Sequence, residues 1–251
     1  MSNVEVLSGG DVIRQTLNEG APVNSFPFPL SLAIWGHVMG GSAALLTFTL
    51  PLFSTKGGAI HRRSGWIYSA SMLVVALSAF LLTPWRIFFD PHRSDSSQSF
   101  AWFLFFIAVF ALTCLQQGLF VLRNKSHAKK TFTIGSLALP TVLVLTAAGI
   151  LALGLRNENT LYVIFPVIAL RTAFKQIRYW LKPSLHTKAW WFFHLENMFI
   201  CSIATVTAFI VTALPRIFPN IVPNIMLWMS PTIVMVPWMF WFIARYKKKF
   251  S

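Results

Sequence analysis

The chain has 251 residues, of which 55% are hydrophobic and only 11% are charged, with 21 lysines and arginines against seven acids. Soluble domains carry about 25% charged residues, so this chain lacks the polar side chains needed to cover a soluble fold. The composition excludes a soluble enzyme, a disordered tail and a nucleic-acid-binding module despite the net charge of +14, and it indicates an integral membrane protein.

Residues 1–28 are expected to form a short polar tail without the basic and apolar regions of a cleavable signal peptide. The intervals between charged residues beyond it are long enough for helices of about 20 residues to cross a bilayer. The sequence therefore predicts a transmembrane domain over 29–246 and a basic cytoplasmic tail at 247–251. The seven expected helices lie at about 29–53, 65–86, 99–122, 132–155, 160–180, 189–214 and 221–244.

The fifth expected helix is the weakest, because only 12 uncharged residues separate Glu158 from Arg171. The distribution of basic residues decides whether this segment crosses, since lysine and arginine concentrate in cytoplasmic loops. With seven crossings and the N-terminus outside, 16 of the 21 basic residues fall on the inner side. The sequence thus predicts an all-α bundle, N-out and C-in, in the cell inner membrane, with anionic lipid headgroups at its cytoplasmic face.

Charged residues inside the hydrocarbon core are costly and are candidate functional residues. Glu196 lies within the sixth expected helix, and Arg171 in the fifth lies at a comparable depth on a rise of 1.5 Å per residue. Because an unpaired buried carboxylate is strongly disfavoured, we expect Glu196 to form an intramembrane ion pair with Arg171 or Lys175. The other interpretation is that Arg171, Lys175 and Arg178 extend toward headgroups at the membrane surface.

Histidines mark a second candidate site. His37 lies in the first expected helix and His194 in the sixth, while His61 and His127 precede the second and fourth helices at the inner face. One interpretation is that helix starts at the interface attract basic residues. The other is that His61, His127 and His194 converge and bind a transition metal such as Zn²⁺ or Fe²⁺, or that two of them bind haem b. The expected depths place His37 away from His194, which argues against a shared ion.

The loop before the second expected helix combines Lys56, two glycines, Arg62 and Arg63. Backbone amides and cations at a helix N-terminus can hold an anion. We therefore expect these three basic residues to contact an anion, with a lipid phosphate as the first candidate.

The same segment, 56–68, resembles the most specific part of a bacterial multi-pass membrane family catalogued as domain of unknown function 2306. Shorter segments at 37–41 and 194–198 are similar to others of that family. The resemblance implies a polytopic helix bundle and no established activity. It also implies that the recurrent histidines of the family correspond to His37, His61, His127 and His194.

The leading hypothesis is a membrane protein that binds a metal or haem through these four histidines, with redox or hydrolytic chemistry both open. A proton-coupled transporter or channel that uses His37 and Glu196 is the alternative, although the inverted repeat of many secondary transporters is not visible in the sequence. A structural membrane subunit, in which the four histidines would be dispensable, is the third hypothesis.

Overall fold

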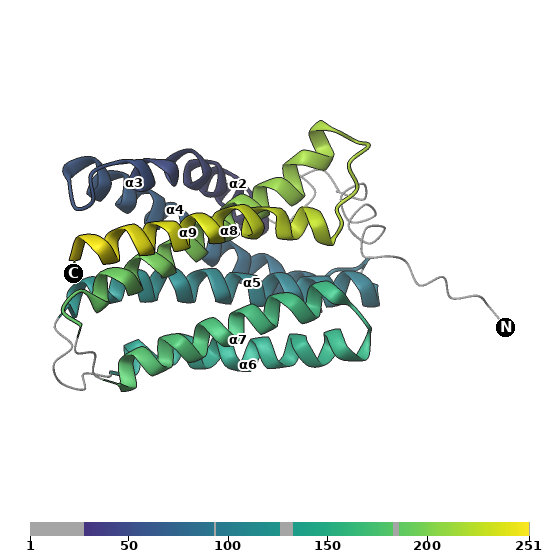
Figure 1. The fold of residues 1–251 in the computed structure, drawn as a ribbon. Coiled ribbons are helices and arrows are strands. Elements are labelled where there is room, and N and C mark those ends of the chain that lie inside the picture. The colour runs from purple at the N-terminus through teal and green to yellow at the C-terminus, as the bar shows by residue number, and fades with distance from the viewer. Residues whose placement is uncertain (1–27, 93, 126–132, 183–185, 251) are drawn as a thin grey trace.

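The computed structural model describes residues 28–92, 94–125, 133–182 and 186–250 (Figure 1). Every regular element in these ranges is helical. The elements are α2 (Phe28–Thr47), α3 (Thr49–Phe53), α4 (Ala59–Phe88), α5 (Asp95–Phe120), the 3₁₀ helix η2 (Val121–Arg123), α6 (Ile134–Arg156), α7 (Thr160–Leu181), α8 (Ala189–Ile217) and α9 (Ile225–Phe250). With α3 continuing α2 and η2 continuing α5, the described residues form seven helices that are long and apolar enough to cross a membrane. The predicted all-α bundle of seven membrane helices is confirmed.

Several helices extend beyond the segments expected from the sequence, and α4 and α9 extend furthest. α4 begins at Ala59 rather than near residue 65, and α9 continues to Phe250 rather than ending near residue 244. The lysines at 247–249, which we expected in a separate tail, therefore lie in the last turn of α9. A helix can continue past the hydrocarbon core because its backbone remains hydrogen-bonded while long basic side chains reach water.

Two helices lie at the centre of the bundle. α5 packs against α4, α6 and α8, and α8 packs in addition against α9 and α2. Figure 1 shows α6 and α7 side by side along one edge of the bundle, with α2 and α4 toward the other. Large apolar side chains such as Trp35, Leu46 and Leu81 are exposed on the outside of the bundle. An apolar outer surface of this kind suits contact with lipid, as expected of a multi-pass membrane protein.

Glycines bring α2 close to α4. A Cβ atom built on Gly40 would lie 3.1 Å from the carbonyl oxygen of Ser71, and one on Gly36 would lie 3.7 Å from Val74. Small residues four positions apart let helix backbones approach closely in a membrane. The Gly36-x-x-x-Gly40 pattern therefore fixes how α2 lies on α4.

Aromatic contacts hold α7 at both of its ends. Near its start, Phe165 contacts Trp228 of α9, with ring centroids 5.8 Å apart. Near its end, Tyr179 stacks on Phe193 of α8, with ring centroids 3.9 Å apart. The middle of α7, between these two contacts, borders a crevice that α8 and α9 also line.

Candidate functional site

His61 and His194 form a pair at the end of the bundle where α9 also ends. His61 lies in the first turn of α4 and His194 in the second turn of α8. Their ring centroids are 6.5 Å apart, and the ring planes make an angle of 68°. Two of the histidines expected to converge from the sequence are thus neighbours, although 133 positions separate them in the chain.

Hydrogen bonds to backbone carbonyls orient both rings. Nδ1 of His61 lies 3.1 Å from the carbonyl oxygen of Pro51, and Nδ1 of His194 lies 2.7 Å from that of Gly118. Because a carbonyl oxygen only accepts, each Nδ1 donates, and in the neutral ring the lone pair is on Nε2. Within the described ranges, neither Nε2 has a hydrogen-bond partner. Both imidazoles are therefore in the tautomer that binds a metal ion through Nε2.

Lys56 lies beside the histidine pair and caps the end of α3. Its Nζ donates to the carbonyl oxygens of Pro51, at 2.8 Å, and Leu52, at 2.6 Å. The ammonium group also lies 5.3 Å from the ring centroid of Phe242 on α9. Burial lowers the pKa of Lys56 to about 8, because the charged amine loses part of its hydration.

Lys56, Arg62 and Arg63, which we expected to contact one anion, differ in their surroundings. Gly57 adopts a φ of 80°, which a glycine tolerates, and this turn directs Lys56 onto the carbonyls of α3. Arg62 and Arg63 are exposed on the first turn of α4. The two arginines thus lie on the surface, whereas the Lys56 ammonium donates to backbone carbonyls.

His37 does not belong to the histidine pair. Its Nδ1 lies 2.9 Å from the hydroxyl oxygen of Ser78 on α4. Ser78 follows His61 by 17 positions in the same helix, which corresponds to about 25 Å along the helix axis. One site built from all four histidines is therefore ruled out by the position of His37.

His127, the fourth predicted histidine, lies outside the described residues. In the part of the chain that the structure describes, no three histidine, cysteine, aspartate or glutamate side chains are grouped so that they could hold a metal ion. Among the described residues, His61 and His194 are therefore the candidate ligands for a metal ion at this end of the bundle.

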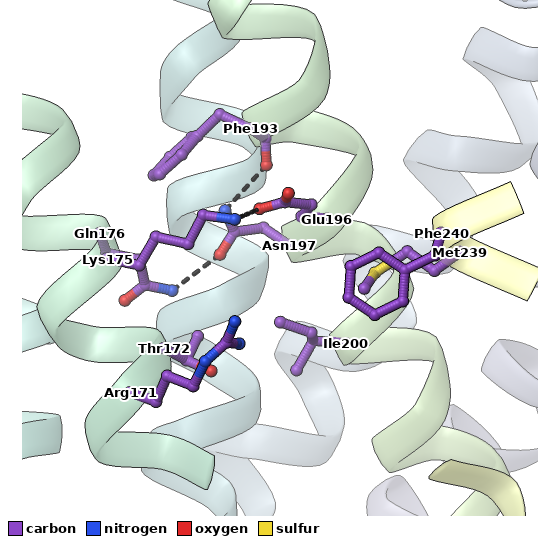
Figure 2. Close-up of a pocket in the computed structure, with 10 residues that line it drawn as sticks. All are labelled: Arg171, Thr172, Lys175, Gln176, Phe193, Glu196, Asn197, Ile200, Met239 and Phe240. Carbon is purple, nitrogen blue, oxygen red and sulfur yellow. Dashed lines mark hydrogen bonds and ion pairs between the residues drawn. The ribbon is translucent and has the colours of Figure 1, made fainter. Parts of the chain in front are cut away.

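Glu196 has the partner that its depth in the membrane required. Lys175 of α7 forms an ion pair with Glu196 of α8 (Figure 2). The Lys175 side chain is 53% exposed and the Glu196 side chain 19% exposed, so the pair lies at the surface of the helix bundle. Of the two partners that the sequence offered, Lys175 makes the contact. Arg171, one turn earlier, forms no ion pair within the described part of the chain.

An amide pair lies directly behind the ion pair, and we did not anticipate it from the sequence. Nε2 of Gln176 donates to Oδ1 of Asn197 over 2.7 Å, and Nδ2 of Asn197 donates to the carbonyl oxygen of Phe193 over 2.8 Å. Both amide side chains are buried. The signal was available, because amide side chains inside membrane helices need partners as charged ones do.

The ion pair and the amide pair border a crevice between α7, α8 and α9 with a volume of about 50 Å³. Figure 2 shows Arg171 extending from α7 toward α8, with Phe240 of α9 on the opposite side. The crevice is lined by Arg171, Thr172, Lys175, Gln176, Phe193, Glu196, Asn197, Ile200, Met239 and Phe240. Its lining combines three charged side chains with an apolar wall, so it can accommodate a small polar group attached to an apolar chain.

Comparison with protein-family models, with curated proteins and with solved structures finds no match for this chain. The resemblance to domain of unknown function 2306 therefore stays a prediction from the sequence motif. The histidine pair and the charged crevice are therefore the features from which function is inferred.

Proposed function

We propose that the chain is a multi-pass membrane protein that binds a transition-metal ion between His61 and His194. The proposal is carried by one observation, the pairing of two rings whose Nδ1 atoms both donate to backbone carbonyls. Imidazole nitrogen is a preferred ligand of Zn²⁺, Cu⁺ and Fe²⁺, and a second hydrogen bond through the other ring nitrogen is the usual way of fixing such a ligand.

The spacing of the two rings fits a single ion. Imidazole nitrogens bind Zn²⁺ at about 2.0–2.1 Å, so two rings on opposite sides of one ion have centroids at most about 6.5 Å apart. The observed centroid distance is 6.5 Å. This distance would suit one ion held between the two rings, with His61 and His194 as nearly opposed ligands, as in a two-coordinate Cu⁺ site.

The local backbone also favours positive charge. Pro51 lies near the carboxyl end of α3 and Gly118 near that of α5, and the partial negative charge at helix carboxyl ends stabilises cations. Lys56 supplies one positive charge to this region. Since burial lowers its pKa to about 8, Lys56 can lose that charge when an ion binds nearby.

Metal content tests the proposal. The protein is purified in detergent and incubated separately with Zn²⁺, Cu⁺ and Fe²⁺. It should retain about one equivalent of one of these ions per chain, as measured by elemental mass spectrometry. His61→Gln and His194→Gln should each lose it, because the glutamine amide can still donate to the carbonyl but offers no metal ligand of comparable affinity.

His37→Gln is the matched control and should keep the metal, because its ring lies elsewhere, on Ser78. A Soret band in the purified protein, lost in both pair variants, would identify haem b as the group bound. Protein with neither a Soret band nor retained metal, or pair variants that bind as the wild type does, would refute the proposal.

We also propose that the end of the bundle that carries the histidine pair faces the cytoplasm, in the cell inner membrane. What supports this orientation is the positive-inside distribution, because Arg62, Arg63 and the lysines at 247–249 lie at this end. Arg62 and Arg63 would then contact anionic headgroups. A reporter enzyme that is active only in the periplasm, fused after residue 251, should be inactive.

A proton-coupled transporter is the second candidate, and the Lys175–Glu196 pair beside a crevice is the observation that favours it. A carboxylate at this depth can exchange a proton when its cationic partner moves away. Flux into proteoliposomes should then depend on the pH gradient and be abolished by Glu196→Gln. A variant that transports at the wild-type rate would exclude Glu196 from proton coupling.

A further inference from the structure

We propose that the crevice between α7, α8 and α9 binds the carboxylate of a single-chain amphiphile, such as a fatty acid, that enters from the bilayer. The head would contact Arg171, and the acyl chain would lie against Ile200 and Phe240. This inference does not depend on metal binding, because it uses residues away from the histidine pair. It uses the crevice beside the Lys175–Glu196 pair but requires no transport.

The charges in the crevice call for one anion. Arg171 and Lys175 contribute two positive charges and Glu196 one negative charge, and Lys175 is already paired with Glu196. Arg171 is left without an ion-pair partner among the described residues. A guanidinium group binds a carboxylate through two parallel hydrogen bonds. One monoanion would therefore pair with Arg171 and neutralise the net charge of +1 in the crevice.

The position of Arg171 in the membrane argues against ordinary lipid headgroups as the source of that anion. Arg171 is eleven residues from Thr160 and ten from Leu181. At 1.5 Å per residue it lies about 15 Å from either end of α7, near the middle of the hydrocarbon core. A phospholipid phosphate stays ionised and remains at the interface, whereas a fatty acid can enter the core as the neutral acid and release its proton on binding Arg171.

The size of the crevice supports the same class of ligand. A volume of about 50 Å³ accommodates a group of a few heavy atoms, as a carboxylate is. Phe240 is 54% exposed and lines the crevice across from Arg171, so it offers an apolar surface to the chain. The crevice thus offers a charged group, Arg171, to the carboxylate and an apolar surface, including Phe240, to the acyl chain.

Binding of radiolabelled oleate to the full-length protein in phosphatidylcholine nanodiscs tests the inference. We expect saturable binding of one oleate per chain, displaced by unlabelled oleate and not by oleyl alcohol, which has the same chain without the charge. Arg171→Gln should weaken binding by about tenfold or more, the usual effect of losing a charge-assisted hydrogen bond.

Arg178→Gln is the matched control, because it removes an exposed arginine from the same helix outside the crevice lining. It should bind oleate as the wild type does, and Arg171→Lys should retain part of the affinity if the charge itself is recognised. Equal displacement by oleyl alcohol, equal binding by Arg171→Gln, or no saturable binding would overturn the proposal. Octadecyl phosphate that displaces oleate more strongly than oleate itself would also overturn it, since the head recognised would then be a phosphate.

Discussion

Gln176 and Asn197 are hydrogen-bonded one position beyond Lys175 and Glu196 in each helix. Two consecutive residues of α7 therefore contact two consecutive residues of α8, the ionic contact at the surface of the bundle and the amide contact in its core. Because α7 packs mainly on α6, these side-chain contacts are a main link between the middle of α7 and the centre of the bundle. Their removal should have measurable effects.

The first prediction concerns the amide pair. Asn197→Leu should lower the free energy of unfolding by about 1–2 kcal/mol, because Gln176 loses its hydrogen-bond partner inside the bundle. Reversible unfolding in mixed detergent micelles would measure this loss. Thr212→Val is the control, since Thr212 is exposed and bonds to its own helix. The double variant Gln176→Leu with Asn197→Leu should recover part of the loss, and a double variant as unstable as the sum of both single ones would contradict the pairing.

The second prediction concerns the ion pair. Lys175→Glu and Glu196→Lys should each reduce the yield of folded protein, because each places like charges next to one another in the membrane. The exchange of both charges should restore the yield, measured as the monodisperse fraction in size-exclusion chromatography. Arg178→Glu combined with Glu196→Lys is the mismatched control and should remain poor. Equal recovery in both double variants would show that net charge, and not this pair, determines the yield.

The third prediction concerns Lys56. Acetylation of its amine, followed by mass spectrometry, should show a pH profile with its midpoint near 8, the lowered pKa of this amine, compared with the ordinary lysine pKa of 10.5. A lysine peptide in the same reaction mixture provides the reference. Since the unfolded chain holds the proton more tightly, the stability of the protein should rise between pH 8 and 10.5, and Lys56→Met should lack this rise. A midpoint equal to that of the peptide would show that Lys56 is fully hydrated.

The fourth prediction concerns the turn between α6 and α7. A Cβ atom on Gly154 would lie 2.5 Å from the carbonyl oxygen of Tyr162, so Gly154→Ala should destabilise the protein by about 1–3 kcal/mol. Gly149→Ala, in the same helix, is the control, because its Cβ would meet no atom within 4 Å. Thermal unfolding of the two variants should therefore differ, and equal melting temperatures would mean that α6 can move away from Tyr162 at little cost.

The membrane helices were predictable because charge is so costly in lipid that the gaps between charged residues mark the crossings. Even the weak helix α7 could be found in this way. Helix ends were less predictable, since α4 and α9 continue beyond the uncharged segment into stretches that carry basic residues. The sequence contains no signal that fixes where such a helix ends.

The partner of Glu196 was predictable only to within one helical turn. Arg171 and Lys175 differ by four positions and share one face of α7, so depth alone could not choose between them. The choice depends on where the ends of α7 are held, by Phe165 against Trp228 and by Tyr179 against Phe193. Such packing is not visible in a single sequence. The amide pair was missed for a different reason, because attention to ionisable residues left neutral polar ones aside.

The Lys175–Glu196 contact has a consequence for biogenesis. Ribosomes deliver α7 to the insertion machinery before α8 has been synthesised, so Lys175 must partition into lipid while its counter-ion, Glu196, is still being translated. α7 is also the least hydropathic of the seven membrane helices. Stable integration of the fifth segment must therefore await the sixth, and a nascent chain truncated ahead of Glu196 should slip back toward the aqueous phase.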